Sequence, residues 1–237
     1  IRTLIIMMNN CSIISAYRQQ MGSEYELLHP QIQKRFDFST TNNIAFLGKG
    51  VMEKIWTGNK LSVLALKILS KSNILFPREG RNISYEIHNY PYTDTCGREV
   101  HSMNRVFYFP DEEQRFDGTA TYVEKKGHII EYLGLDHKMF FDMQLSAEDG
   151  AIRFRSGKQY AFLGNFKIAI PRCFRANIDL LEWYDDQTQR FHLDLSVKSN
   201  FFGPLFGFNG WFDAEYIDFE GKKLPDKFKP TREECRE

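Results

Sequence analysis

Residues 81–133 carry the feature that most constrains the fold, a regular alternation of apolar and polar residues. It runs through three consecutive segments joined by short turns, RNISYEIHNYPY, REVHSMNRVFYFP and RFDGTATYVEKKGHIIEYL. Alternation with a period of two gives each strand one apolar face, and turns of a few residues join antiparallel neighbours. The pattern therefore predicts a series of consecutive antiparallel strands.

The same alternation continues beyond residue 133, for example in Phe191, Leu193, Leu195 and Val197. At the usual strand length of about 5 to 6 residues or more, we expect about nine or ten strands. A sheet of this size twists, and closing it removes the unpaired edges. The sequence therefore predicts a mainly β (α+β) fold, an antiparallel meander curled into a barrel or half-barrel. Such a barrel has room for a small ligand.

The region before the meander predicts short helices and a first strand. Residues 13–36 have helical spacing interrupted by Gly22 and Pro30, which favours several short N-terminal helices. Residues 43–56 read as a strand containing Gly48 and Gly50. Glycines inside a strand indicate a bulge or a close approach of another backbone.

Residues 60–76 predict one helix between the first two strands. Leu61, Leu64, Ile68 and Leu69 form an apolar stripe, with lysines off it. Amphipathic helices usually pack their apolar stripe on the protein core. We therefore expect this stripe to face the sheet, with a membrane-surface helix or a lid as the alternatives.

The length of 237 residues and the lack of a linker indicate a single domain, residues 1–237. Its parts are the N-terminal helices (13–36), a barrel-like body (43–218) and a charged tail (219–237) that we expect to be frayed. Lys and Arg together number 31, as do Asp and Glu, which argues against a nucleic-acid partner. The opening IRTLIIMM is too short to span a bilayer. A first residue other than Met indicates a fragment or a start at Met7 or Met8.

The four cysteines, Cys11, Cys96, Cys173 and Cys235, are far apart in the sequence and form no C-x-x-C pair. A zinc site or a disulfide framework normally has closer spacing. Free thiols in a reducing, cytoplasmic environment are therefore expected. His88 and Glu86 lack a third ligand nearby, so no metal site is expected, and no cofactor is indicated.

The first hairpin can be paired by arithmetic. A loop from Thr93 to Gly97 would pair Tyr85 with Arg105 and Asn89 with His101. These residues lie on the more apolar face, which we expect to face the core. A one-residue slip would move every side chain to the other face, so the register is an assumption.

Polar residues on that face are the candidate ligand-binding set. A small-molecule pocket usually contains a few polar groups among many apolar and aromatic ones. The set comprises Arg105, His101, Asn89, Tyr85 and Glu182, to which Glu131 is a possible addition.

Each member of the set has a structural alternative. A buried guanidinium keeps its charge and needs a carboxylate, supplied by Glu182, Glu131 or a ligand. A structural Arg–Glu pair would satisfy the same need. His101 could serve as a general base, or be a core histidine hydrogen-bonded to Asn89.

An ordered series of short motifs resembles an uncharacterised bacterial domain family of unknown function. They are FPREGRN (76–82), GREV (97–100), RFD (115–117), YLG (132–134), RSG (155–157), EWYDD (182–186) and GPLFGFNG (203–210). Members of this family stand alone or follow a saccharopine-dehydrogenase-like NAD(P)-binding domain. The resemblance implies a cytoplasmic bacterial context and a possible NAD(P)-binding redox partner. The chain itself has no G-x-G-x-x-G motif.

Three functions follow as hypotheses. The first is binding of an apolar or amphipathic small molecule, whose polar or anionic end Arg105 would contact. The second is a barrel-type enzyme of the isomerase or cyclase kind, with His101 or Glu182 as base. The third is an interaction domain that docks on a redox partner through the 203–210 edge or the 60–76 helix.

Overall fold

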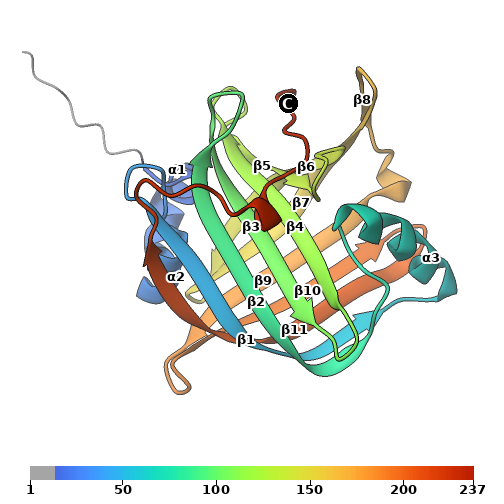
Figure 1. Ribbon diagram of the computed structural model, residues 1–237, viewed down its shortest axis with the longest axis horizontal. Helices are drawn as coiled ribbons and strands as arrows, with labels where there is room; N and C mark the ends of the chain where they lie inside the picture. Colours follow the sequence, from blue (N-terminus) through green and yellow to red (C-terminus); the bar gives the residue numbers. More distant parts are fainter. Residues whose placement is uncertain (1–13) are drawn as a thin grey trace, which may run out of the picture.

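The computed structural model describes residues 14–237 and shows a barrel with helices at both ends (Figure 1). Every strand pairs antiparallel with its neighbours. The strands are β1 (Ile44–Thr57), β2 (Gly80–Thr93), β3 (Glu99–Tyr108), β4 (Glu113–Val123), β5 (His128–Leu133), β6 (Met139–Glu148), β7 (Ala151–Leu163), β8 (Phe166–Ala169), β9 (Ala176–Asp185), β10 (Arg190–Ser199) and β11 (Gly203–Asp218).

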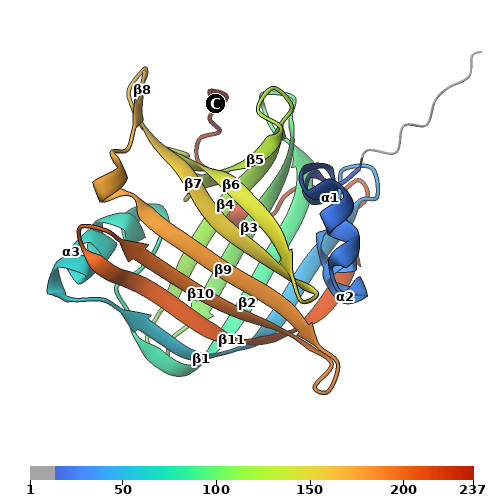
Figure 2. The ribbon, with the colours of Figure 1, turned by 180° about the vertical axis from the view of Figure 1, so that it is seen from behind.

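The barrel is closed, and its ring has ten strands. The order runs from β6 through β5, β4, β3, β2, β1, β11, β10 and β9 to β7, and β6 also pairs with β7. The short β8 pairs with β7 outside this ring, as Figure 2 shows from behind. The predicted antiparallel barrel is thus confirmed, in its closed form. The 203–210 segment is no edge, because β11 pairs with both β1 and β10.

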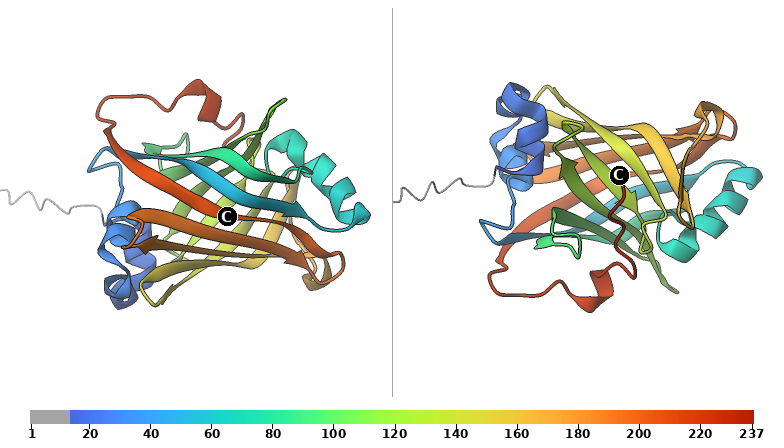
Figure 3. Two further views of the ribbon diagram at one scale, coloured as in Figure 1. Left: turned by 90° about the horizontal axis from the view of Figure 1, so that it is seen from below. Right: turned by 90° about the horizontal axis from the view of Figure 1, so that it is seen from above.

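The predicted short N-terminal helices are present, and they close one end of the barrel as a helical plug. They are α1 (Ala16–Met21), η1 (Gly22–Leu27) and α2 (Pro30–Phe36). Ser15 caps α1 by accepting a hydrogen bond from the Arg18 amide, and Pro30 occupies the first turn of α2, where no amide is needed. The other end carries α3 (Lys60–Leu69) and η2 (Ser70–Ser72) (Figure 3). Among residues 14–237, none of the helices has the length and apolar character needed to cross a bilayer.

The glycines of β1 mark a close backbone approach, as expected. A Cβ at Gly50 would overlap the Trp211 carbonyl of β11. The β1–β11 register also shifts between Met52 and Lys54. Both expected features, a bulge and a close approach, therefore occur in this strand.

The predicted register of the first hairpin is wrong by two residues. Tyr85 pairs with Phe107, and Asn89 pairs with Met103. The turn has the assumed length but lies one residue later in the chain, after the pair of Thr93 with Glu99. Asp94 accepts hydrogen bonds from the amide and guanidinium of Arg98 and so keeps both residues in the turn. A shift of two residues leaves every side chain on its predicted face.

The expected packing of α3 is also wrong. Leu61, Leu64 and Ile68 are 51%, 57% and 66% exposed, whereas Ser62 and Leu66 are buried. The start of the helix fixes this orientation, since the Ser62 hydroxyl donates to the Pro204 carbonyl of β11 at 3.0 Å. Leu61, Leu64 and Ile68 consequently face away from the barrel, whereas Leu69, the fourth member of the stripe, packs against the core.

The tail is packed rather than frayed. Phe228 is buried with its ring centroid 4.4 Å from that of His88 on β2. The Thr231 amide donates to the Leu135 carbonyl at 2.8 Å, so the tail follows the outer surface of the barrel.

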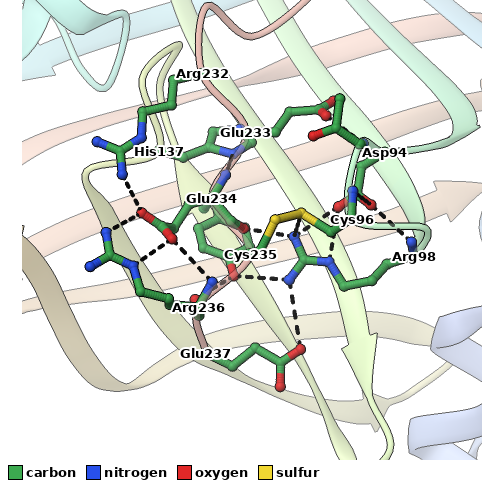
Figure 4. Close-up of a disulfide and its surroundings, with 12 residues drawn as sticks. Asp94, Cys96, Arg98, His137, Arg232, Glu233, Glu234, Cys235, Arg236 and Glu237 are labelled. Carbon is green, nitrogen blue, oxygen red and sulfur yellow. Dashed lines mark hydrogen bonds and ion pairs between the residues drawn. A yellow bond between two sulfur atoms is a disulfide. The ribbon is translucent and has the colours of Figure 1, made fainter. Parts of the chain in front are cut away.

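The last residues of the tail form a disulfide with the β2–β3 turn. Cys96 and Cys235 are bonded, with their Cα atoms 5.8 Å apart (Figure 4). Arg98 supports the junction by donating to Asp94 at 2.9 Å and to the Glu234 carbonyl at 2.7 Å. The expectation of free thiols is therefore wrong for this pair. Disulfides persist mainly in oxidising compartments, so the cytoplasmic location loses that support and stays a prediction.

Candidate functional site

The five candidate residues all lie on the inner face of the barrel. Each is no more than 5% exposed: Arg105, His101, Asn89, Tyr85 and Glu182. They come from three strands, β2, β3 and β9. The alternation pattern placed them on the correct face, although it did not identify their partners.

Arg105 is a buried guanidinium without a carboxylate partner. It lies on β3 between Ile87 and Phe116, and its guanidinium carbon is 4.7 Å from the Phe116 ring centroid. Among residues 14–237, no carboxylate oxygen comes within 4.0 Å of it, and its Nη1 atom is buried without a hydrogen-bond partner. Neither of the two expected glutamates therefore forms a direct ion pair with Arg105.

Glu131 is a buried acidic side chain whose pKa the charge of Arg105 affects. It projects inward from β5 over Gly118 of β4, where a Cβ would overlap its carboxylate. Burial raises the pKa of the Glu131 carboxyl, and the charge of Arg105 opposes this shift. Gly118 thus provides the space in which a buried carboxyl lies near an unpaired guanidinium.

Glu182 pairs with Arg35, a residue that the sequence analysis missed. The Arg35 Nε atom lies 3.2 Å from Glu182 Oε1, and both side chains are buried. The Arg35 guanidinium carbon is also 3.7 Å from the Phe46 ring centroid. Burial raises the pKa of the Glu182 carboxyl, while Arg35 and then Arg105 lower it. Arg35 lies on α2 of the helical plug, so the alternation of residues along the strands could not predict that its side chain is buried in the barrel.

His101 lies beneath the N-terminal helices. Its ring stacks on that of Tyr17, with 5.8 Å between the ring centroids, and the centroid of the Phe38 ring lies 4.5 Å from that of His101. Its nearest acidic atom is Glu99 Oε1, at 3.4 Å from Nε2. Glu99 was missed, yet it stands two residues from His101 on the same strand face and could have been found from the alternation.

Asn89 and Tyr85 do not form the expected contacts with His101. The Asn89 side-chain amide donates to the Ser102 carbonyl at 3.0 Å, so the expected His101–Asn89 hydrogen bond is absent from the described part of the chain. The Tyr85 hydroxyl is buried without a hydrogen-bond partner. Burial raises the pKa of this phenol, and the nearby Arg105 charge opposes the shift.

The interior is nearly filled by side chains. A cavity of about 20 Å³ remains, and Arg105, Glu131, Met103 and Met143 contribute to its lining. This volume admits roughly one water molecule. An apolar ligand of any size therefore needs side chains to move.

The wall beside this cavity contains a seam between β7 and β9. Backbone pairing of the two strands covers only the stretch from Ile152 with Glu182 to Arg155 with Asp179. Beyond it, side chains bridge the strands: the Ile178 amide donates to Ser156 Oγ at 2.9 Å, and the Ala176 amide donates to Gln159 Oε1 at 3.0 Å. Side-chain bridges in place of a continuous backbone ladder make the seam a part of the wall where local opening breaks few backbone hydrogen bonds.

Residues 14–237 contain no cluster of three His, Cys, Asp or Glu side chains that could ligate a metal ion. His88 and Glu86 do contact each other, with 3.0 Å between His88 Nε2 and Glu86 Oε2. They lie on the outer face, opposite the buried candidates. Burial lowers the pKa of His88, while Glu86 opposes that shift.

Two comparisons with known proteins match the chain. It is 28% identical over 192 residues to the uncharacterized protein YndH of Bacillus subtilis (strain 168), which covers 81% of this chain and 93% of that protein. The model of a family described as a domain of unknown function, DUF4166, matches residues 28–212. The match spans α2 and the barrel from β1 into β11, and it confirms the expected kinship with an uncharacterised family. The chain therefore belongs to the DUF4166 family.

Proposed function

We propose that the barrel binds a small molecule whose anionic or strongly polar group contacts Arg105. The observation that carries the proposal is the buried guanidinium without a carboxylate partner, directly beside a small cavity. Buried charges in folded proteins are ordinarily paired, because an isolated one is costly to desolvate. A bound anion would supply the missing partner.

The rest of the ligand would enter where the barrel wall can open and where the side chains that line the cavity can change conformation. Met103 and Met143 line the cavity, and methionine side chains adapt their shape readily. Arg155, Ser156 and Ile178 line the same cavity and belong to the seam between β7 and β9. Opening at the seam would connect Arg105 with the outside, and an apolar tail would then replace the methionine contacts.

Native mass spectrometry of the protein purified from cells tests this proposal. We expect a co-purifying mass that dissociates in the gas phase and is absent from the Arg105→Met variant. Arg115→Met is the matched control, because Arg115 lies on the neighbouring strand and already pairs with Asp117 at 2.9 Å. Retention of the same ligand by Arg105→Met, or a protein that neither carries nor takes up any amphipathic anion, would contradict the proposal.

The two alternatives receive less support. The enzyme hypothesis requires His101 and Glu182 to act together, but their close partners are Glu99 and Arg35. Docking on an NAD(P)-binding redox partner through the 203–210 edge fails because β11 has neighbours on both sides. The exposed stripe of α3 remains as a surface for contacts outside the barrel.

A further inference from the structure

We infer that the α3 end of the barrel docks on an anionic membrane surface. The docking surface consists of α3, the β10–β11 turn and η3 (Arg172–Phe174). These elements lie at the same end of the barrel in Figures 2 and 3. This inference is independent of the Arg105 site.

The three elements form one continuous surface. The Asn59 amide at the start of α3 donates to the Phe202 carbonyl at 3.2 Å, and the Gly58 amide donates to the Leu205 carbonyl at 2.9 Å. On the other side of the turn, the Phe201 ring lies 5.3 Å from the Phe174 ring of η3, between centroids. The turn therefore links the helix and η3 directly.

Large apolar side chains project from this surface into solvent. On α3 they are Leu61, Leu64 and Ile68, and beyond it Phe201 and Phe174 are 61% and 50% exposed. They stand on a helix, a turn tip and a short helical turn, and thus do not line a groove. Exposed apolar groups gathered in one place mark an interaction surface. Separate projecting side chains suit a fluid lipid interface better than a protein partner, which would need a matching shape.

The segments that carry these side chains contain basic residues and no acidic ones. Residues 54–78, 150–178 and 195–212, from which the surface is built, contain no Asp or Glu, although the chain has 31 of each sign. Lys60, Lys67, Lys71, Arg172 and Lys198 are exposed there and form no ion pair within residues 14–237. Basic groups at a membrane surface are attracted to anionic lipids, and long lysine side chains can reach the headgroups while their stems stay in apolar surroundings.

Together these observations distinguish the surface from an ordinary solvated helix. An ordinary helix of this kind would present its apolar stripe to the barrel, as expected from the sequence. Here the Ser62 hydrogen bond to β11 holds Leu61, Leu64 and Ile68 outward, and two exposed phenylalanines stand on neighbouring segments that, like α3, contain no Asp or Glu. Partial insertion of such side chains, with lysines at the headgroup level, is the usual mode of interfacial binding.

The test is cosedimentation with vesicles of phosphatidylcholine alone or mixed in equal parts with phosphatidylglycerol. We expect binding to the mixed vesicles that weakens as salt is added, because salt screens exposed charges. Leu64→Asp should reduce this binding roughly tenfold or more, since it removes a leucine that would insert into the lipid and places a negative charge against anionic headgroups. Leu27→Asp is the matched control, because Leu27 is 67% exposed on η1 at the opposite end of the barrel.

A second pair of variants tests the basic residues. Lys67→Glu should lower binding to the mixed vesicles at least about fivefold, and Lys125→Glu at the opposite end should leave it unchanged.

The exposed thiol of Cys173 in η3 offers a second readout. A polarity-sensitive fluorophore attached there, in a Cys11→Ser background, should shift to shorter wavelength on the mixed vesicles. Equal binding of Leu64→Asp and Leu27→Asp, no binding to the mixed vesicles, or a fluorophore that stays in water on bound protein would overturn the inference. The leucine and lysine substitutions are at exposed positions, and an unchanged circular dichroism spectrum verifies the fold of each variant.

Discussion

The regions around Arg35 and Arg105 place the same chemical group inside the same barrel, once with an acidic partner and once without. Arg35, on the helical plug, has a glutamate at 3.2 Å and an aromatic ring at 3.7 Å. Arg105, in the wall, contacts an aromatic ring at 4.7 Å and has no acidic partner within ion-pair distance in the described chain. The comparison separates a guanidinium that stabilises the plug from one that is free to contact a ligand.

The largest expected effect is at Arg35. Arg35→Met leaves Glu182 buried without its partner, and breaking a buried pair in this way costs about 4 kcal/mol in the free energy of unfolding. Urea denaturation measures the loss. Lys34→Met, at an exposed position one residue earlier, is the control and should change the stability by about 0.5 kcal/mol or less.

Adding Glu182→Leu to Arg35→Met should restore most of the lost stability, because no buried charge then remains unpaired. If Arg35→Met alone is harmless, Arg35 does not stabilise the plug and the two arginines are equivalent. That result would remove the basis of the comparison.

A smaller effect is expected at Glu131, and it depends on pH. Burial raises the folded-state pKa of this carboxyl above its ordinary value of 4.5, so the folded protein holds the proton longer than the unfolded chain. Stability from this group is therefore present below pH 4.5 and decreases as the pH rises through the folded-state pKa. Urea titrations at several pH values should show this decrease in the wild type and a flatter profile in Glu131→Gln. Equal slopes would mean that Glu131 is not desolvated.

The smallest effect on stability is expected at Arg105. Arg105→Met removes a buried charge that has no ion-pair partner, and Glu131 can respond by keeping its proton, so the change should stay within about 1 kcal/mol. The same denaturation experiment measures it beside Arg35→Met. A loss of stability as large as that of Arg35→Met would show that Arg105 stabilises the fold. That result would count against a role of Arg105 in binding a ligand.

Strand alternation was sufficient to predict the barrel and the side of the wall on which each candidate lies. Asn89, His101 and Arg105 face inward as expected, even though their pairing is displaced by two residues. The displacement arises in the turn, where Asp94 binds Arg98, and a periodicity of two carries no information about such a contact.

Contacts between distant segments escaped the sequence analysis. Arg35 reaches Glu182 from a helix whose sequence has no strand pattern, and Ser62 turns α3 outward through a hydrogen bond to a residue more than a hundred positions away. The pairing of Cys96 with Cys235 depends on where the tail returns, which residue spacing alone does not specify. Local periodicity predicts faces, whereas partners depend on the closed three-dimensional arrangement.

The bond between Cys96 and Cys235 makes the chain a covalent loop across 139 residues. The exposed turn between β7 and β8, at Leu163–Phe166, lies within that loop. A protease that cuts there would yield two fragments that migrate together on a gel until a reductant is added. Limited proteolysis would thus report what fraction of the protein taken from a given compartment carries the disulfide.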